Sequence, residues 1–255
     1  MSSYFHDEEA LARTAIALGA SSGAGVRVAI LDSGVDTAHP ALEGLSLADD
    51  VMFEAGGNFL ESKAGNGDAI GHGTAIAWII RRLAPCAEIG SFRVLDGALR
   101  SRSTVIWEAA RLALERGYQI LNCSFGSPGE ARFVMPYKEW TDAAYLSRAH
   151  IVAACSNDDA GLREWPGWFP TVLTVNLAAL DHDGWEHRTG AGMVEFAARG
   201  FEVTVPWQGG WKKVTGSSFA APVVSAWLAR LVSLQPDLSV EQAKELMRRL
   251  AGRRM

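Results

Sequence analysis

This chain alternates between short apolar stretches, which suit buried strands, and longer stretches of helical pattern. Of all features of the sequence, this alternation limits the possible folds most. The first strand pattern, residues 26–31, follows a helical pattern over residues 7–18. Further strands are expected at 88–95, 118–124, 151–154 and 172–175, and helices at 75–83, 103–116, 136–149 and 218–234. Strands that alternate with helices predict an α/β fold with a mostly parallel central sheet, covered by helices on both faces.

The remaining segments are harder to assign from pattern alone. Residues 44–71 contain many glycines and polar residues, so we expect a loop there with one short strand around Val51. Short strands are expected at 194–197 and 201–205. Ser239 and Gln242 have capping-box spacing, which predicts a final surface helix.

Composition sets the broad class of the protein. With 255 residues, of which 48% are hydrophobic, the chain can bury one large core, so a single domain over 1–255 is expected, with 1–25 as an N-terminal helix and lead-in. A net charge of -5 gives no reason to expect a nucleic-acid partner. The first residues lack the pattern of a signal peptide, and no apolar run is expected to reach membrane-spanning length. We therefore expect a cytoplasmic protein with no membrane partner; the sequence does not indicate an oligomeric state.

The three cysteines, Cys86, Cys123 and Cys155, are odd in number and lie in or beside apolar segments. We interpret them as reduced, buried residues that pack as small hydrophobic groups. No pair of cysteines or histidines has the spacing of a metal site.

Three polar residues stand at the ends of apolar elements. Asp32 follows the first strand and precedes Ser33-Gly34, which suits either an active-site carboxylate or a turn aspartate. His72 lies between two glycines at the start of a helix, and Ser218 lies in the first turn of the long apolar helix. Taken alone, Ser218 is as well explained as a helix cap.

Together, the same three residues fit nucleophilic catalysis. Acyl transfer by serine needs a base that takes the hydroxyl proton and a carboxylate that orients and stabilises that base. The backbone N–H groups at the start of a helix would also stabilise negative charge that develops near Ser218. The ordered set Asp32, His72, Ser218 is therefore a candidate catalytic triad.

The stretches around these residues resemble the motifs of the subtilisin-like serine proteases (subtilases, peptidase family S8). Residues 28–36 resemble the aspartate motif of that family, 71–74 its histidine motif and 216–222 its serine motif; the order Asp, His, Ser is that of subtilisin. The similarity covers roughly residues 26–236. It implies the three-layer subtilisin-like fold and hydrolysis of peptide bonds through an acyl-enzyme.

The resemblance also implies an oxyanion hole and a substrate groove. Residues 152–158 resemble the strand that ends in the family's oxyanion-binding asparagine, here Asn157, which would act beside the Ser218 backbone N–H. Residues 121–126 resemble the strand that pairs with the substrate, and 165–170 the segment that closes the first specificity pocket. The substrate-binding residues that follow from this are Ser124, Phe125, Gly126 and Ala154.

Charged residues beside the groove suggest a preference among substrates. Arg100 and Arg102 would lie on a second edge, 99–102, where they either favour acidic substrate side chains or are simply solvated loop residues. Asp158, at the expected rim of the first pocket, would favour a basic residue before the cleaved bond.

The chain also departs from the family pattern. Ser217 and Phe219 flank the candidate nucleophile where threonine and methionine are frequent, and Cys155 replaces a small residue and would narrow the pocket. Ala41 stands where a calcium-binding aspartate is common, and the calcium loop after His72 is missing, so we expect no cofactor and no calcium requirement. Only about two dozen residues precede the first strand, so we expect an intracellular-type member made without a pro-domain.

The predicted function is thus a serine endopeptidase that acts on a peptide or protein. Limited processing of a substrate is favoured over broad degradation, and both remain open. The alternative is a catalytically silent module that only binds peptides on a protease-like fold. Nucleotide binding is excluded because the glycine-rich run 19–25 precedes the first strand and does not follow it.

Overall fold

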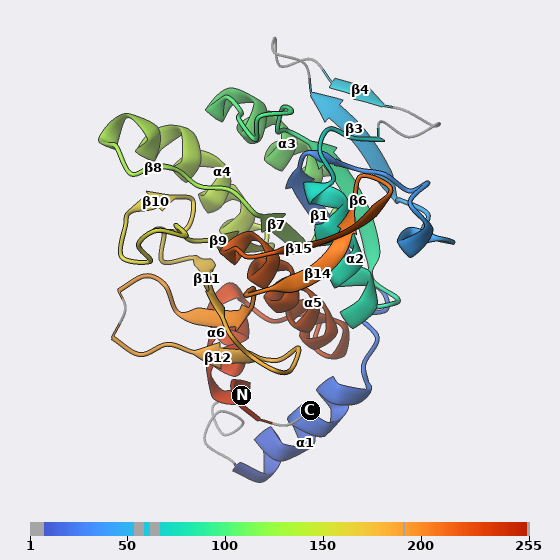
Figure 1. Ribbon diagram of the computed structural model, residues 1–255. Helices are drawn as coiled ribbons and strands as arrows, with labels where there is room; N and C mark the ends of the chain where they lie inside the picture. Colours follow the sequence, from blue (N-terminus) through green and yellow to red (C-terminus); the bar gives the residue numbers. More distant parts are fainter. Residues whose placement is uncertain (1–7, 54–58, 62–66, 191, 254–255) are drawn as a thin grey trace.

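A nine-stranded sheet forms the centre of the computed structural model, which describes residues 8–253 except 54–58, 62–66 and 191 (Figure 1). In spatial order its strands are β12 (Trp185–His187), β13 (Phe196–Arg199), β11 (Val172–Ala178), β9 (His150–Ala154), β7 (Ile120–Cys123), β1 (Arg27–Asp32), β6 (Glu88–Arg93), β3 (Asp49–Phe53) and β4 (Phe59–Glu61).

The strands pair in parallel from β13 to β3, and only the two outermost strands, β12 and β4, run antiparallel to their neighbours. The central strand β1 is buried from Val28 to Asp32, as expected of a strand with helices on both faces. In a parallel sheet all strands end on the same edge, so the residues after β1, β7 and β9 are brought close together.

Helices cover both faces of the sheet and divide the hydrophobic core into two layers. One layer contains residues of α1 (Glu8–Ala20), α2 (His72–Leu83), α5 (Ser217–Leu234) and α6 (Val240–Leu250). The other contains residues of α3 (Ser103–Glu115) and α4 (Val134–Leu146). The three-layer α/β arrangement predicted from the sequence is therefore confirmed. Asp7, where the first helix was expected to start, lies outside the described residues.

Helix α5 passes through the core beneath the sheet. Among the described residues it is the one helix long and apolar enough to cross a membrane, but 78% of it is buried within the fold. The prediction that no apolar run reaches that length was therefore wrong for α5. Its apolar residues face all sides because the helix is enclosed by the sheet and by α1, α2 and α6.

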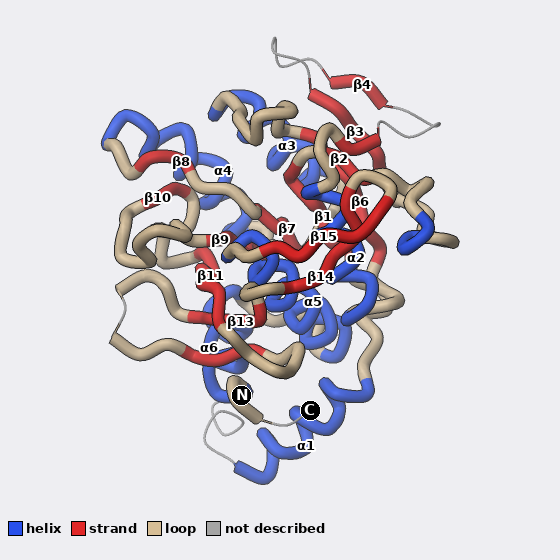
Figure 2. The backbone as a smooth tube through the Cα atoms, in the orientation of Figure 1, coloured by secondary structure: helices blue, strands red, loops and turns tan. Residues whose placement is uncertain are grey.

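Three small ribbons lie outside the main sheet. They are β2 (Gly34–Val35) with β5 (Gly67–Asp68), β8 (Ser127–Pro128) with β10 (Glu164–Trp165), and β14 (Val203–Trp207) with β15 (Gly210–Val214). The strand predicted around Val51 is confirmed as β3, but the prediction of only one strand in residues 44–71 was wrong, because β4 and β5 also lie there. Figure 2 shows the ribbon β14–β15 crossing in front of α5.

Two local predictions had different outcomes. Ser239 caps α6 in a capping box with Gln242, as its spacing predicted. Cys123 and Cys155 are buried, but Cys86 is exposed in the turn before β6, so its interpretation as a buried residue was wrong. All three cysteines are free thiols.

Candidate active site

Asp32 is the last residue of β1 and has no solvent exposure. Its Oδ1 accepts a hydrogen bond of 2.8 Å from the backbone N–H of Ser33 and one of 2.7 Å from Nδ1 of His72. Such donors replace the hydrogen bonds to water that a wholly buried carboxylate loses. The bond to Nδ1 also leaves the other ring nitrogen, Nε2, free to accept a proton.

His72 is held in place by the tight start of α2. Gly71, which precedes it, has φ of 97°, and a Cβ on Gly73 would lie 2.1 Å from the carbonyl oxygen of Gly34. Neither position accepts a larger residue without strain, which explains why the histidine lies between two glycines. Gly73 allows α2 to approach the end of β1 closely enough for the ring to meet Asp32.

The surroundings of the His72 ring determine its basicity. Phe219 and Trp207 contact it, with ring centroids at 5.3 Å and 6.3 Å, and the side chain is 6% exposed. This burial by itself lowers the pKa of the imidazole, but the charge and hydrogen bond of Asp32, helped by Asp68, raise the pKa above its usual value. His72 is therefore a stronger base than a free histidine.

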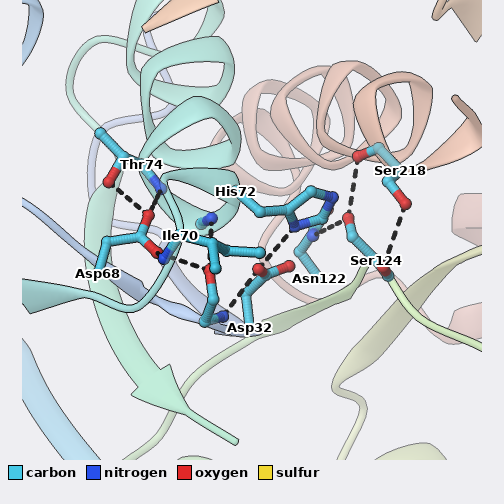
Figure 3. A network of polar contacts seen from close by, with 10 residues as sticks. Asp32, Asp68, Ile70, His72, Thr74, Asn122, Ser124 and Ser218 are labelled. Atoms are coloured by element: carbon cyan, nitrogen blue, oxygen red, sulfur yellow. Dashed lines mark hydrogen bonds and ion pairs between the residues drawn. The ribbon is translucent and has the colours of Figure 1, made fainter. Parts of the chain in front are cut away.

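Ser218 lies in the first turn of α5 and is partly exposed. Its Oγ donates a hydrogen bond of 3.2 Å to the carbonyl oxygen of Ser124. Among the described side chains no hydrogen bond joins Ser218 to His72. Figure 3 shows the His72 ring between Asp32 on one side and the pair of Ser218 and Ser124 on the other.

A chain of hydrogen bonds fixes the backbone at Ser218. Pro222 has no N–H, so it leaves the carbonyl of Ser218 without its usual partner one turn along the helix. Oγ of Ser124 donates to that carbonyl at 3.0 Å and itself accepts from Nδ2 of Asn122 at 3.0 Å. Oδ1 of Asn122 in turn accepts from Oγ of Ser225 at 2.8 Å. Strand β7 is thereby joined to α5 directly beside Ser218.

Asn157 follows β9 and reaches the start of the same helix. Its Oδ1 accepts a hydrogen bond of 2.7 Å from the backbone N–H of Ser217. That contact leaves the Nδ2 group of Asn157 as a donor directed away from Ser217. The hydroxyl of Ser217 donates to the carbonyl of Cys155 at 2.6 Å, which ties the segment after β9 to α5.

The predicted substrate-binding residues lie on several segments, of which the one after β7 is bonded to Ser218 through Ser124. Ser124, Phe125 and Gly126 follow β7, and Ala154 ends β9, the neighbouring strand. Arg100 and Arg102 lie in the exposed loop before α3, where they help to line a cavity of about 450 Å³ together with Met52, Phe53 and Val105. Asp158 is exposed next to Asn157.

Comparison with known proteins identifies the protein family to which this chain belongs. The sequence profile of the Subtilase family, Peptidase_S8, matches residues 23–254. The chain belongs to the subtilase family. Subtilases are serine endopeptidases, so the family assigns this class of activity to the chain.

Curated subtilases are similar along most of the chain. Subtilisin DY of Bacillus licheniformis is 25% identical over 87% of this chain and 82% of its own length. The major intracellular serine protease of Bacillus subtilis (strain 168) is 28% identical over 84% of this chain and 70% of its own length. Among solved structures, a cold-adapted subtilisin-like serine proteinase has a TM-score of 0.72 at 22% identity, covering 88% of this chain and 81% of its own. That likeness supports the fold.

Asp68 is a residue of this subtilase site that the sequence did not single out. Its carboxylate accepts hydrogen bonds from Oγ of Ser33 at 2.7 Å, from the backbone N–H of Ile70 at 3.0 Å, and from both N–H and Oγ1 of Thr74 at 2.8 and 2.6 Å (Figure 3). It thus joins the turn after β1 to the first turn of α2, the two segments that carry Asp32 and His72. In the sequence, only its position four residues before His72 could have indicated that Asp68 belongs to the site.

Proposed function

We propose that Ser218 is the nucleophile of this endopeptidase, that His72 is the general base and then the general acid, and that Asp32 orients His72. The observation that carries the proposal is the buried 2.7 Å bond between Asp32 and His72. It holds the ring in the tautomer that exposes Nε2 on the side of Ser218 and raises the pKa of the imidazole. Both effects suit a base that takes a hydroxyl proton.

The attack requires one rotation of the Ser218 side chain. In the free protein Oγ donates to Ser124 through a 3.2 Å bond, which is long for a hydroxyl donor. Rotation about the Cα–Cβ bond moves Oγ to another staggered position, from which it donates to Nε2 of His72. Catalytic hydrogen bonds of this kind often form only when substrate is bound.

Negative charge on the substrate oxygen would be taken up at the start of α5. The first N–H groups of a helix have no partner within the helix, and the Ser218 N–H is among them. We propose that Nδ2 of Asn157 is the second donor, because the bond from Ser217 to Oδ1 directs that group away from the helix. Donors fixed in advance stabilise the oxyanion without reorganisation.

The groove favours limited processing over broad degradation. Phe219 packs against His72, where we propose that the leaving group departs. Arg100 and Arg102 are exposed in the loop before α3, which we propose forms the other edge of the groove. Bulky and charged groups at several positions exclude many peptide sequences. The proposed substrate is a peptide or an exposed protein segment. We propose that the reaction occurs in the cytoplasm and needs no metal ion.

Mapping of cleavage sites tests this proposal. The purified chain is incubated with a mixture of denatured proteins, and the new termini are identified by mass spectrometry. Limited processing predicts few cleavage sites that share a sequence pattern around the cut bond. Many sites without a shared pattern would contradict limited processing, and no cleavage at all by folded protein would contradict the endopeptidase role.

A further inference from the structure

Glu164 places a carboxylate beside the predicted substrate strand, although the sequence did not identify it. The residue begins β10, which pairs antiparallel with β8, directly after Gly126 (Figure 1). A Cβ on Gly126 would lie 2.5 Å from Oε2 of Glu164 and 2.8 Å from its Cδ. The carboxylate therefore lies against the backbone of Gly126, in the space that a side chain there would occupy.

This carboxylate is within reach of a substrate side chain bound at Ser218. Ser124 is joined to Ser218 by two hydrogen bonds, of 3.0 and 3.2 Å. Gly126 lies two residues further, a distance of at most about 7 Å along an extended chain. A substrate residue placed for attack by Ser218 could thus reach Glu164 with an extended arginine or lysine side chain.

The walls around Glu164 are held rigidly. Trp165, the next residue, packs on Phe169 with ring centroids at 4.6 Å, and its Nε1 donates to the carbonyl of Glu130 at 3.2 Å. Ala154 contributes only a methyl group, at the end of β9. The packing of Trp165 on Phe169 fixes the backbone at Glu164 and so limits where its carboxylate can lie.

Within the described residues, Glu164 has no counter-charge. It forms no ion pair within the described part of the chain, and Asp158 brings a second negative charge nearby. Partial burial, and after it the charge of Asp158, raise the pKa of the Glu164 carboxyl above its usual value. A cation that entered this space would offset both effects, whereas an acidic side chain would add to the repulsion.

We propose that Glu164 selects arginine or lysine as the substrate residue directly before the cleaved bond. The carboxylate can bind a guanidinium through two parallel hydrogen bonds or a lysine ammonium through one. Asp158, more exposed, adds a weaker attraction at the rim. This inference rests on the proposed role of Ser218, because the position of the cleaved bond defines which substrate side chain reaches Glu164.

The test compares peptides that differ only at the residue before the cleaved bond, with arginine, lysine, glutamine or phenylalanine there. In wild type, kcat/KM should be highest for arginine and lysine. In Glu164→Gln, the ratio of kcat/KM for arginine over glutamine should fall about 10- to 100-fold, the range for a hydrogen-bonded charge. Asp158→Asn should change the ratio less than about fivefold, as expected for an exposed charge. The control, Glu139→Gln, removes an exposed charge on α4 and should leave the ratio unchanged.

The outcomes separate this inference from the proposed function. Titration with a serine-directed phosphonate gives the concentration of competent enzyme, so a poorly folded variant is not mistaken for an unselective one. If wild type reacts with the phosphonate and cleaves peptides, but Glu164→Gln keeps the same ratio, Glu164 is not the selecting residue. The charge-reversed variant Glu164→Arg gives a second test, because the inference requires this variant to prefer glutamate before the cleaved bond. A Glu164→Arg variant without that preference would also contradict the inference. If wild type neither reacts nor cleaves, the proposed function fails first.

Discussion

Replacing Ser218 by alanine should lower kcat by about 10⁶-fold, the size found when the nucleophile of subtilisin is removed. Alanine cannot form the acyl-enzyme. The two neighbouring hydroxyls are both engaged, because Oγ of Ser217 donates to the carbonyl of Cys155 and Oγ of Ser124 donates to the carbonyl of residue 218. Stability should change little, since Ser218 is partly exposed and its hydroxyl makes one long hydrogen bond, worth about 1 kcal/mol or less. Hydrolysis of a chromogenic peptide and a thermal melt measure the two effects.

The neighbouring serine provides a matched control for this substitution. Ser217→Ala removes a buried hydroxyl that holds the segment after β9, so it should lower the melting temperature. The folded fraction should still acylate, because Ser218 is intact. Substantial hydrolysis by purified Ser218→Ala would contradict the role given to Ser218. A complete loss of acylation in folded Ser217→Ala, with acylation kept in Ser218→Ala, would also contradict it.

Replacing Asp32 by asparagine should lower kcat/KM by about 10⁴-fold with the fold intact, as in related triads. The amide can turn an N–H toward Nδ1, which would hold the ring in the tautomer whose Nε2 already carries a proton. Loss of the negative charge also changes the pH profile. His72 must be neutral to act as a base, so wild-type activity rises with pH through the raised pKa of His72.

The direction of the pH shift distinguishes this mechanism from simple damage to the site. Without Asp32, burial dominates and the pKa of His72 falls, so the residual activity of Asp32→Asn should begin to rise at lower pH than in wild type. Asp36→Asn, in the following turn, serves as the control and should keep the wild-type profile. An acid limb that stays in place, or a loss smaller than about tenfold, would show that Asp32 does not act through His72.

The sequence predicted the elements of this site whose signals are local. Local sequence patterns indicate a strand before Asp32, a tight helix start at His72 and a buried helix after Ser218. A parallel sheet then brings the strand ends together. The sheet, both helical layers and the ends of β1, β7 and β9 were predicted on this basis. The family resemblance added Asn157 and the substrate strand.

The contacts that depend on distant segments were not predictable in the same way. Asp68 matters because donors from Ser33, Ile70 and Thr74 converge on it, and nothing in its own surroundings in the sequence shows this. The position of Glu164 beside Gly126 depends on the pairing of β10 with β8. These strands have only two residues each, which is too short to be predicted from a sequence pattern.

Side-chain conformation was equally beyond a sequence pattern. The hydroxyl of Ser218 rests on Ser124 and not on His72 because the rotamer depends on which acceptors the folded chain places nearby. The exposure of Cys86 has a similar origin: its apolar surroundings in the sequence form a surface turn between α2 and β6.

Covalent labelling with a serine-directed phosphonate tests most directly whether Asp32, His72 and Ser218 act together. The folded chain is treated with the reagent, and the added mass is located by peptide mapping. We predict one adduct, on Ser218, with labelling absent in Ser218→Ala and greatly slowed in His72→Ala and Asp32→Asn. An unlabelled wild-type chain, an adduct on another residue, or a rate that does not depend on His72 would contradict the account.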